Sequence, residues 1–284
     1  MISRIKKGLE VRLLQDSNYL KRRFKKKTGR TLNLKNPKSF SEKIQWYKIY
    51  YKNPLLKTLA DKAEVKEYVA KKIGSEYVIP THSLFENYED IKVKNIPQFY
   101  ILKTTNGSGK NLICAKGDCF SEEYIQGYFK KWLKKSYYLH SKEWAYKDIK
   151  PCVICEELIF DEEGNLPKDY KFFCFNGTVR FIQVDHGRFT HHTRSIYDQD
   201  WNKLDFSIEE PMHKTKIAEP KNFHKMKEIA ETISKELPFA RIDLYNIDGR
   251  VLFGEATFYP GAGLQKFSDY NWDLKFGELI RLPK

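Results

Sequence analysis

The stretch RIDLYNIDGRVLFGEATFYPG, residues 241–261, decides the fold of this chain. Hydrophobic residues alternate with polar ones on both sides of Asp248-Gly249, a dipeptide typical of the tight turn in a β-hairpin. The pattern therefore predicts two antiparallel strands. Asp243 interrupts the apolar pattern of the first strand, and Glu255 and Thr257 share one face of the second because side chains alternate along a strand.

Two carboxylates and a hydroxyl on paired strands are hard oxygen donors of the kind that Mg²⁺ prefers. A Mg²⁺ ion that keeps its waters and binds nucleotide phosphates needs only one or two carboxylates from the protein. The alternative is that both acids lie at a rim that faces water, where Asp and Glu are usually found. The remainder of the chain has to distinguish these two interpretations.

Length and composition predict a folded protein with a large core. The chain has 284 residues, of which 15% are aromatic. It contains no apolar run of the ~20 residues that a membrane span needs, and its start lacks the apolar core of a signal peptide, so we expect a cytoplasmic protein. Five cysteines in no recognisable pattern are typical of a reducing compartment.

The positive charge is concentrated near the N-terminus. Residues 1–52 hold 16 Lys or Arg against 3 acids, and 16 − 3 gives +13 of the net +14. Ile2, Ile5, Leu9 and Leu13 recur at helical spacing between basic residues. Such a helix, within residues 1–30, is suited to anionic lipid or another polyanion, or it packs its apolar stripe on the body. We expect no nucleic acid, because no nucleic-acid-reading motif accompanies the charge.

A Gly-containing loop follows the predicted buried strand at residues 99–103. Gly107, Ser108 and Gly109 lie within the loop Thr104–Lys110, and an apolar strand returns after it. Glycines let backbone N–H groups close around phosphate oxygens, and flanking lysines supply positive charge. The order of residues differs from a P-loop and from GxGxxG, and a plain hairpin loop remains the alternative.

Further elements follow from periodicity and caps. Ser39 with Glu42 predicts a capping box at a helix start, residues 59–73 predict one helix, and residues 122–135 another. Residues 169–184 predict a hairpin that turns at Asn-Gly, with Asp169 and Lys171 on one face.

Two short motifs have competing interpretations. Cys152 and Cys155 are three residues apart in a predicted strand, so their side chains point to opposite faces, and no second Cys/His pair completes a metal site. Asp198-Gln199-Asp200 is a DxD triplet of the kind that holds a metal-bound nucleotide sugar in many glycosyltransferases, but a turn before Trp201 explains it equally well.

Taken together, several stretches resemble the TupA-like ATP-grasp family, which is found with bacterial surface-polysaccharide biosynthesis. The resemblance covers about residues 33–283 and is carried by FSEKIQWYKIYYKNPLLKTLADKAEVKEYV, LKTTNGSGKN, DYKFFCFNG, YDQDW and RIDLYNIDGRVLFGEATFYPGAG. It implies an α+β protein with the ATP-grasp fold, in which two α+β subdomains clasp ATP. The implied division is a basic helical segment at 1–60, the subdomains with the phosphate loop at 61–160, and the subdomain with the metal-binding hairpin at 161–284.

The resemblance also implies roles for individual residues. Lys62 and Lys103 would hold the ATP phosphates, with the loop around Gly107, Ser108 and Gly109 closing over them. Backbone groups of the hinge would pair with adenine, at Glu156, Glu157 and Ile159. Asp169 would bind the ribose, and Lys171 would lie near the phosphates. Mg²⁺ would be held by Asp243, Glu255 and Thr257, where the wider superfamily usually has Asn in place of Thr257, and Arg241 would stabilise the transferring phosphoryl group.

The implied activity is ATP- and Mg²⁺-dependent ligation of a carboxylate to an amine through an acyl phosphate. The expected partners are a nucleotide, an amine, and a glycan, nucleotide-sugar or lipid-linked sugar acceptor, for example an acidic sugar that receives an amino acid. One alternative keeps the fold but ends at phosphoryl transfer, as in a sugar or glycan kinase. The other is a glycosyltransferase that uses the DxD triplet.

Overall fold

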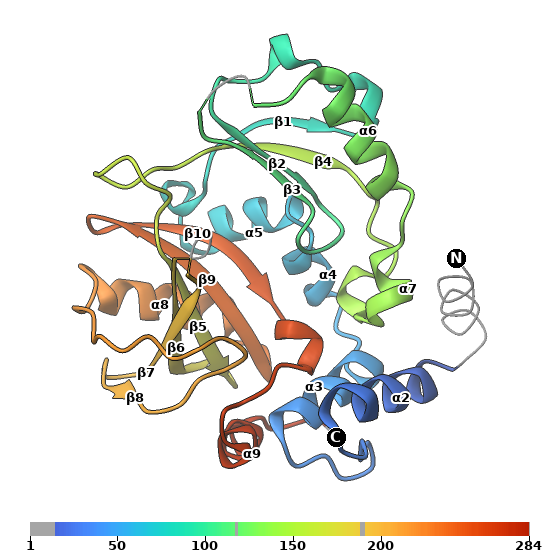
Figure 1. The fold of residues 1–284 in the computed structure, drawn as a ribbon, viewed down its shortest axis with the longest axis vertical. Helices are drawn as coiled ribbons and strands as arrows, with labels where there is room; N and C mark the ends of the chain where they lie inside the picture. Colours follow the sequence, from blue (N-terminus) through green and yellow to red (C-terminus); the bar gives the residue numbers. More distant parts are fainter. Residues whose placement is uncertain (1–14, 117–118, 188–190, 284) are drawn as a thin grey trace.

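Two antiparallel sheets form the two lobes of the molecule, and helices surround both (Figure 1). The computed structural model describes residues 15–116, 119–187 and 191–283. The smaller sheet has the strand order β1-β4-β2-β3, and the larger has the order β10-β9-β5-β6-β7-β8. The predicted α+β class is confirmed. The helix predicted around residues 2–13 lies outside the described residues.

The smaller lobe is built on four short strands with a helix across them. The strands are β1 (Thr81–Phe85), β2 (Tyr100–Thr104), β3 (Asn111–Cys114) and β4 (Val153–Glu157). Two α-helices, α6 (Glu122–Leu133) and α7 (Tyr137–Ser141), follow β3, and single 3₁₀ turns lie at η2 (Tyr88–Asp90), η3 (Val93–Asn95) and η4 (Trp144–Tyr146). Leu102 of β2 and Phe129 of α6 belong to one buried cluster, so α6 covers one face of this sheet.

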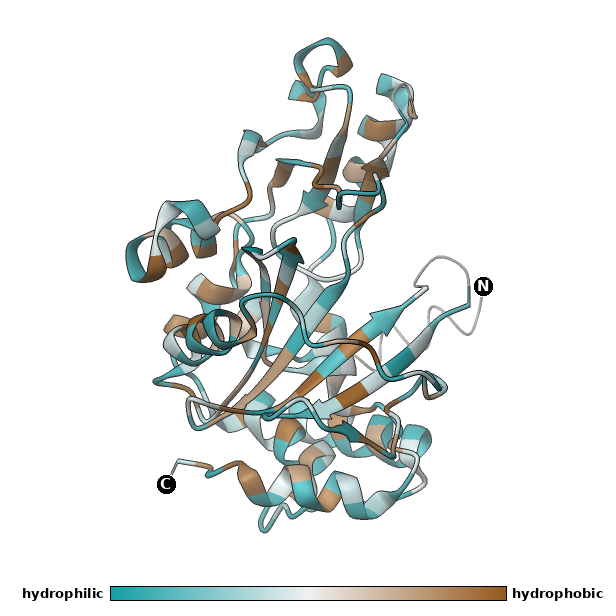
Figure 2. Cartoon of the chain, turned by 90° about the vertical axis from the view of Figure 1, so that its left-hand side faces the viewer, coloured by the Kyte–Doolittle hydropathy of each residue, from teal (hydrophilic) through white to brown (hydrophobic). Residues whose placement is uncertain are grey.

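The larger lobe contains the other six strands. They are β5 (Asp169–Phe175), β6 (Thr178–His186), β7 (Thr193–Asp198), β8 (Lys203–Leu204), β9 (Phe239–Ile247) and β10 (Arg250–Thr257). Its remaining elements are α8 (Phe223–Ser234), η5 (Pro260–Gly263) and α9 (Tyr270–Leu279). Figure 2 shows hydrophobic and hydrophilic residues alternating along these strands, as a sheet with chemically different faces requires.

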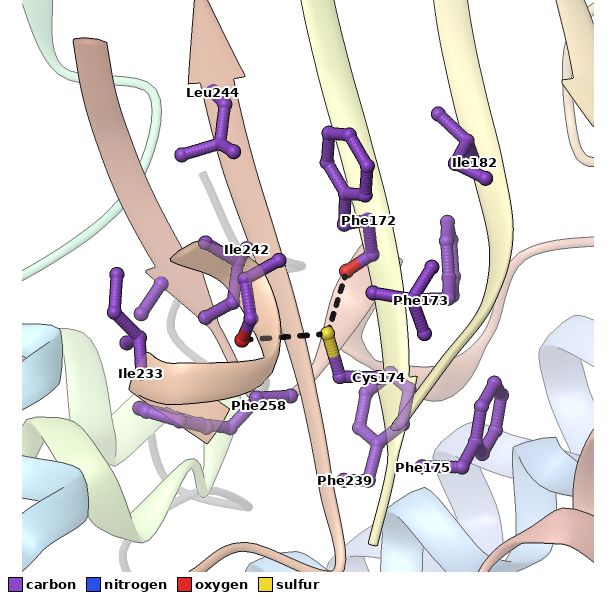
Figure 3. Close-up of a cluster of buried hydrophobic side chains, with 14 of the residues drawn as sticks. Phe172, Phe173, Cys174, Phe175, Ile182, Ile233, Phe239, Ile242, Leu244 and Phe258 are labelled. Carbon is purple, nitrogen blue, oxygen red and sulfur yellow. Dashed lines mark hydrogen bonds between the residues drawn. The ribbon is translucent and has the colours of Figure 1, made fainter. Parts of the chain in front are cut away.

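Strand β5 shows how this alternation separates core from site. Phe172 stacks on Phe223 of α8, and Cys174 Sγ lies 3.7 Å from the Ala230 carbonyl oxygen of the same helix (Figure 3). Phe173, between them in sequence, packs edge-on against Phe276 of α9 on the opposite face. Residues 169 and 171 continue that opposite face beyond its apolar part. Their charged side chains therefore emerge where the sheet leaves the core.

The N-terminal helices pack on the body of the protein. They are α2 (Asp16–Thr28), α3 (Phe40–Tyr50), α4 (Leu55–Ala60) and α5 (Glu64–Ile73), with η1 (Ser75–Tyr77) after them. Leu20 and Phe24 of α2 are buried in one cluster with Leu32 and Leu34. The described part of the basic segment therefore uses its apolar stripe for packing. No helix among the described residues is long and apolar enough to cross a membrane.

Two predictions about helix starts have different outcomes. The capping box at Ser39 and Glu42 is confirmed at the start of α3. The single helix predicted over residues 59–73 is wrong, because α4 ends at Ala60 and α5 begins at Glu64. The Asp61 carboxylate causes this break, since it accepts hydrogen bonds from the backbone N–H groups of Ala63 (2.8 Å) and Glu64 (3.2 Å). Lys62 consequently lies in a bend and not on a helix face.

We expect Gly277→Ala to destabilise the protein and Gly127→Ala to leave it unchanged or slightly more stable. An added Cβ at Gly277 of α9 would lie 2.1 Å from the Lys38 carbonyl oxygen, whereas one at Gly127 of α6 would meet nothing within 4 Å. Overpacking of this kind costs about 1–3 kcal/mol, and alanine exceeds glycine in a helix by roughly 0.5–1 kcal/mol. Urea unfolding of both variants measures the difference, and equal stabilities would contradict close packing of α9 on residues 38–40.

Candidate active site

Lys103 of the smaller lobe points away from α6. Leu102 faces the core beneath α6, so the next residue, Lys103, faces the opposite side. Its Nζ lies 2.5 Å from Oε2 of Glu156, which is buried on the neighbouring strand β4. Burial raises the pKa of Glu156, but Lys103 and Lys66 outweigh it and hold that pKa below its usual value. Glu156 therefore stays ionised and fixes the Lys103 ammonium group on the face of the sheet opposite α6.

Lys62 joins the helical segment to the Gly-rich loop. Its backbone N–H donates to the Thr105 carbonyl oxygen at 3.4 Å, and its Nζ donates to the Gly107 carbonyl oxygen. Burial lowers the pKa of Lys62, while Glu255 of the larger lobe raises it. This lysine therefore lies within electrostatic range of both lobes, beside the loop that the sequence analysis assigned to phosphate.

Lys66 is a site residue that the sequence analysis missed. It lies on α5, and its Nζ donates to Glu156 Oε1 and to the Ile79 carbonyl oxygen, both at 2.6 Å. Burial lowers the pKa of Lys66, and Glu156 opposes this shift. In the sequence, Lys66 stands four residues after Lys62, a spacing that would place both lysines on one face of a continuous helix. The break at Asp61 leaves Lys62 outside the helix, so this spacing does not relate the two side chains in the structure.

The predicted hinge residues lie at the end of β4. Glu156 is paired within the sheet with Ile101 on one side and Thr81 on the other. The backbone N–H of Glu157 donates to the Pro80 carbonyl oxygen at 3.1 Å, and Ile159 follows the strand. Strand β4 ends at Glu157, so the backbone after this residue lies outside the strand. Adenine binding by these residues stays a prediction.

The hairpin of residues 239–257 forms as predicted, and a β-bulge aligns its polar residues. Phe253 pairs with Leu244, but Glu255 pairs with Asp243, so Gly254 is the extra residue. A Cβ at Gly254 would lie 3.0 Å from the Asp243 carbonyl oxygen, which is why glycine suits the bulge. The resulting register places Thr257 opposite Arg241.

The polar side chains of this hairpin converge on the guanidinium group of Arg241. Arg241 holds Asp243 through two hydrogen bonds of 2.7 Å, from Nε and Nη2. The same Nη2 lies 3.5 Å from Glu255 Oε1 and 3.2 Å from Thr257 Oγ1. Burial opposes the charge on Arg241, but Asp243 outweighs it and raises the Arg241 pKa. Three oxygens of the predicted metal set thus surround one cationic nitrogen.

Lys171 forms the centre of a second, buried network. Its Nζ lies 2.9 Å from Asp243 Oδ2, 3.1 Å from Asp169 Oδ2 and 3.9 Å from Asp185 Oδ2. Burial lowers the Lys171 pKa, but Asp243 and Asp169 outweigh it and raise it above its usual value. The predicted proximity of Asp169 and Lys171 on one face is confirmed by this geometry, whereas their contacts with ribose and phosphate stay predictions.

The sequence analysis also did not identify Asp185 and Arg194 as site residues. Arg194 Nε donates to Asp185 Oδ1 at 2.7 Å, and Gln183 Nε2 donates to the same oxygen at 2.9 Å. Lys171 pairs with Gln183 in the sheet, and Asp185 shares the face of Gln183 two residues on. The register of β6 against β5 is the feature that could have identified Asp185 as a neighbour of Lys171.

The DxD triplet forms a turn. Oδ1 of Asp198 accepts from the backbone N–H groups of Asp200 (2.9 Å) and Asn202 (2.8 Å), and Oδ2 accepts from Asn202 Nδ2 at 3.0 Å. Both oxygens of its carboxylate thus hold the turn between β7 and β8. We expect Asp198→Asn to lower the free energy of unfolding by about 1 kcal/mol and to leave nucleotide binding unchanged. Calorimetric titration with ATP and with a UDP-sugar tests this, and loss of UDP-sugar binding would favour the glycosyltransferase interpretation.

The cysteines differ in part from expectation. Cys152 and Cys155 are unpaired and buried, and burial raises the pKa of Cys155 to about 12, so neither forms a metal site. Cys114 and Cys119, however, are joined as a disulfide with Cα atoms 5.4 Å apart, which the expectation of reduced cysteines did not include. Among the described residues, no group of three or more His, Cys, Asp and Glu side chains could hold a metal ion.

Two antiparallel sheets that face each other, one with a lysine-flanked Gly-rich hairpin and the other with a carboxylate hairpin, define an ATP-grasp protein. More particularly, the chain belongs to the TupA-like ATP-grasp family, since the family model described as TupA-like ATPgrasp matches residues 42–281. The predicted family and fold are thereby confirmed. No curated protein sequence matches the chain.

The solved structures to which the chain is similar are remote from it in sequence. D-alanine–D-alanine ligase from Bacillus anthracis is 14% identical with a TM-score of 0.45, covering 78% of this chain and 65% of its own. The ATP-grasp ligase PsnB complexed with minimal precursor is 12% identical with a TM-score of 0.43, covering 73% and 54%. Phosphoribosylamine–glycine ligase from Thermotoga maritima is 15% identical with a TM-score of 0.44, covering 72% and 48%. The chain thus spans about half to two thirds of these proteins.

Proposed function

We propose that the chain is an ATP- and Mg²⁺-dependent carboxylate–amine ligase. One observation carries the proposal: Lys62 lies between the basic residues of the smaller lobe and the acidic hairpin of the larger lobe. Its Nζ donates to the Gly107 carbonyl oxygen, and burial lowers its pKa while both Glu255 of the hairpin and Glu156 of β4 raise it. Membership of an ATP-grasp family supplies the chemistry that such an arrangement serves.

The nucleotide would lie along β4, from the backbone beyond Glu157 to the Gly-rich loop. Lys62 and Lys103 would neutralise its phosphates, and the backbone of Gly107, Ser108 and Gly109 would close over them. Asp169 would bind the ribose. Phosphoryl transfer depends mainly on placement and on charge, so these cations account for much of the catalysis.

The donor set of the hairpin fits Mg²⁺. Asp243, Glu255 and Thr257 offer three hard oxygens directed at one point, and that point is already occupied by a cationic nitrogen of Arg241. Two carboxylates with one hydroxyl also match the few protein ligands that Mg²⁺ requires beside water and phosphate oxygens. When bound, Mg²⁺ would offset the negative charge that builds up on the phosphates. Thr257 supplies a neutral oxygen where the superfamily usually has Asn.

The reaction would proceed in two transfers. A substrate carboxylate attacks the γ-phosphorus, ADP leaves, and an acyl phosphate forms. Arg241 lies beside the acidic hairpin, where its charge would stabilise the phosphoryl group during transfer, and Lys171 would hold Asp243 in position. An amine then displaces phosphate to give an amide, with no residue of the chain acting as a covalent nucleophile.

The acceptor and the cellular role extend this proposal. We propose an acidic sugar in glycan, nucleotide-sugar or lipid-linked form as the carboxylate, in surface-polysaccharide biosynthesis, which is the context of the resembling family.

The basic residues of segment 1–30 would favour the anionic inner face of the plasma membrane. Titration with anionic vesicles of the full chain and of a chain lacking residues 1–30, with its melting temperature as the folding control, tests this part alone, and equal association would contradict it.

The decisive test separates nucleotide binding from ligation. We expect ATP with Mg²⁺ to raise the melting temperature by mass action, and ADP release to require both a carboxylate and an amine, with inorganic phosphate as co-product. Formation of a stable phosphorylated product without amine would favour the glycan kinase. Absence of any ATP binding, together with binding of a UDP-sugar, would refute both ATP-dependent activities.

A further inference from the structure

A pocket of about 240 Å³ lies beside the Gly-rich loop, away from the predicted hinge. In the β2–β4 pair, Thr104 lies opposite Val153 and Tyr100 opposite Glu157. The loop and the hinge are therefore separated by the length of this strand pair, roughly 13 Å for four steps of 3.3 Å. Figure 1 shows α7 beside the β2–β3 loop, and α7 forms a wall of the pocket. A second substrate bound in this pocket would lie next to the loop that, in the proposed function, closes over the phosphates.

Three cations line this pocket and are held in place by their neighbours. Lys110 and Lys135 place their Nζ atoms 4.0 Å and 4.3 Å from the centre of the Trp132 ring. Arg23 of α2 donates from Nη1 to the His140 carbonyl oxygen at 2.9 Å. Lysine and arginine side chains are the groups that bind a carboxylate through charge-assisted hydrogen bonds.

A single carboxylate, that of Glu143, lines the same pocket and is almost fully buried. Its Oε1 lies 3.8 Å from Nζ of Lys48, beyond hydrogen-bond distance. Lys48 Nζ is instead held by the carbonyl oxygens of Ala262 (2.8 Å) and Ser141 (3.3 Å). The Glu143 carboxylate thus has a nearby cation to support its charge but keeps capacity for another donor.

The surroundings of Glu143 suit proton exchange near neutral pH. Burial raises the pKa of Glu143 to about 7 although Lys48 and Arg23 oppose this, and burial lowers the pKa of Lys48 to about 8. The charged and titratable groups that face Glu143 are Arg23 of α2, Lys48 of α3, Tyr137 of α7, Tyr146 of η4 and Tyr259 after β10. Burial raises the pKa values of the three tyrosines well above neutrality, so they stay uncharged.

We propose that this pocket binds the amine co-substrate as a zwitterionic amino acid. Arg23, Lys110 and Lys135 hold its carboxylate, and Glu143 accepts the proton from its ammonium group. The inference rests on the proposed ligase function and assigns a substrate class and a base to it. A pocket with three cations and one buried acid matches a ligand that carries one anionic group and one ammonium group.

In the proposed step the amine attacks the acyl phosphate, and each proton and electron pair has a defined destination. An N–H bond of the ammonium group breaks and its proton passes to a Glu143 oxygen, which frees the nitrogen lone pair. This pair forms the C–N bond to the acyl carbon, the bond from that carbon to the phosphate oxygen breaks, and phosphate leaves with the electron pair. A second proton passes from nitrogen to the departing phosphate, and the product is a neutral amide.

The test is calorimetric titration of the intact chain with each of the twenty standard L-amino acids at pH 8, without nucleotide. For the tightest binder we then titrate its analogue without the carboxylate and its analogue without the amine. We expect each analogue to bind at least about tenfold more weakly than the amino acid, because each lacks one charge-assisted contact. Glu143→Gln should weaken the amino acid about tenfold but not the acid without the amine, and Lys110→Gln with Lys135→Gln should weaken both.

Amino-acid binding to the unaltered chain should also weaken as the pH falls below about 7, because a protonated Glu143 no longer attracts an ammonium group. Glu143→Gln should lack this dependence, with its melting temperature as the folding control. If ATP with Mg²⁺ binds but no amino acid does, the pocket assignment is wrong and the ligase proposal stands. Amino-acid affinity that is equal in Glu143→Gln refutes the base. Failure of nucleotide binding itself refutes the proposed function.

Discussion

Replacing Glu255 by Gln should abolish the gain in ATP affinity that Mg²⁺ provides, without changing the stability of the fold. The Glu255 side chain is 42% exposed, and its contacts are at 3.5 Å from Arg241 and 3.3 Å from Thr257. Loss of its charge in such a position changes the free energy of unfolding by about 0.5 kcal/mol or less. A missing carboxylate in a site of two carboxylates and one hydroxyl removes half of the anionic charge available to the cation.

Calorimetric titration with ATP in Mg²⁺ and in EDTA measures this effect without knowledge of the acceptor. We expect tighter binding with Mg²⁺ for the unaltered chain, a difference at least about tenfold smaller for Glu255→Gln, and ATP turnover reduced on the order of 10²-fold or more. Glu228→Gln is the matched control, since this glutamate of α8 is exposed and pairs only with Lys225 at 3.1 Å among the contacts described. An unchanged Mg²⁺ effect in Glu255→Gln would place the metal elsewhere.

The parts of the site that lie close together in sequence were predictable. Alternation along a strand placed Glu255 beside Thr257 and Asp169 beside Lys171, and the Asp248-Gly249 turn defined the hairpin. Local periodicity suffices for such pairs because the period of two is a property of the strand itself. The same reasoning explains why the hairpin and the Gly-rich loop were found although their relative placement was not.

The parts that depend on tertiary pairing were missed for a physical reason. Asp185 reaches Lys171 only through the register of β6 with β5, and register is set by the burial of a whole face and not by the residue concerned. Lys66 reaches Glu156 only because the Asp61 carboxylate interrupts a continuous helical pattern. Resemblance to the family supplied Lys62 and Lys103, but it did not indicate that Glu156 holds Lys103 and Lys66 together.

Lys171→Met should cause the largest loss of stability among the substitutions considered. Lys171 and its three carboxylate neighbours are all at least nine-tenths buried, so removal of the ammonium group leaves surplus negative charge in the interior. Breaking a buried pair by removing one partner typically costs about 3–5 kcal/mol, against a total stability of roughly 5–15 kcal/mol for a folded protein. Arg241 still compensates Asp243 and Arg194 still compensates Asp185, but the three carboxylates then share one cation fewer.

The dependence on pH distinguishes this charge effect from a simple loss of packing. Burial raises the Asp185 pKa, but Lys171 and Arg194 lower it to about 2, so this carboxylate stabilises the native state above its unfolded pKa near 3.9 and loses that contribution as the pH falls towards 2. Without Lys171 the carboxylate pKa values rise and the folded protein binds protons more readily. The cost of Lys171→Met should therefore be smaller at pH 5 than at pH 7.5.

Urea unfolding at both pH values gives this difference, and adding Asp169→Asn to Lys171→Met should restore part of the stability at pH 7.5 because it removes one of the three carboxylates that lie around position 171. Lys225→Met, on the exposed side of α8, is the control and should change the free energy of unfolding by about 0.5 kcal/mol or less. A cost for Lys171→Met that is independent of pH and unaffected by Asp169→Asn would show that the lysine stabilises the sheet by the packing of its methylene groups. In that case Asp169, Asp185 and Asp243 would be held by the two arginines and the surrounding donors, and the place of Lys171 at the centre of the network would be refuted.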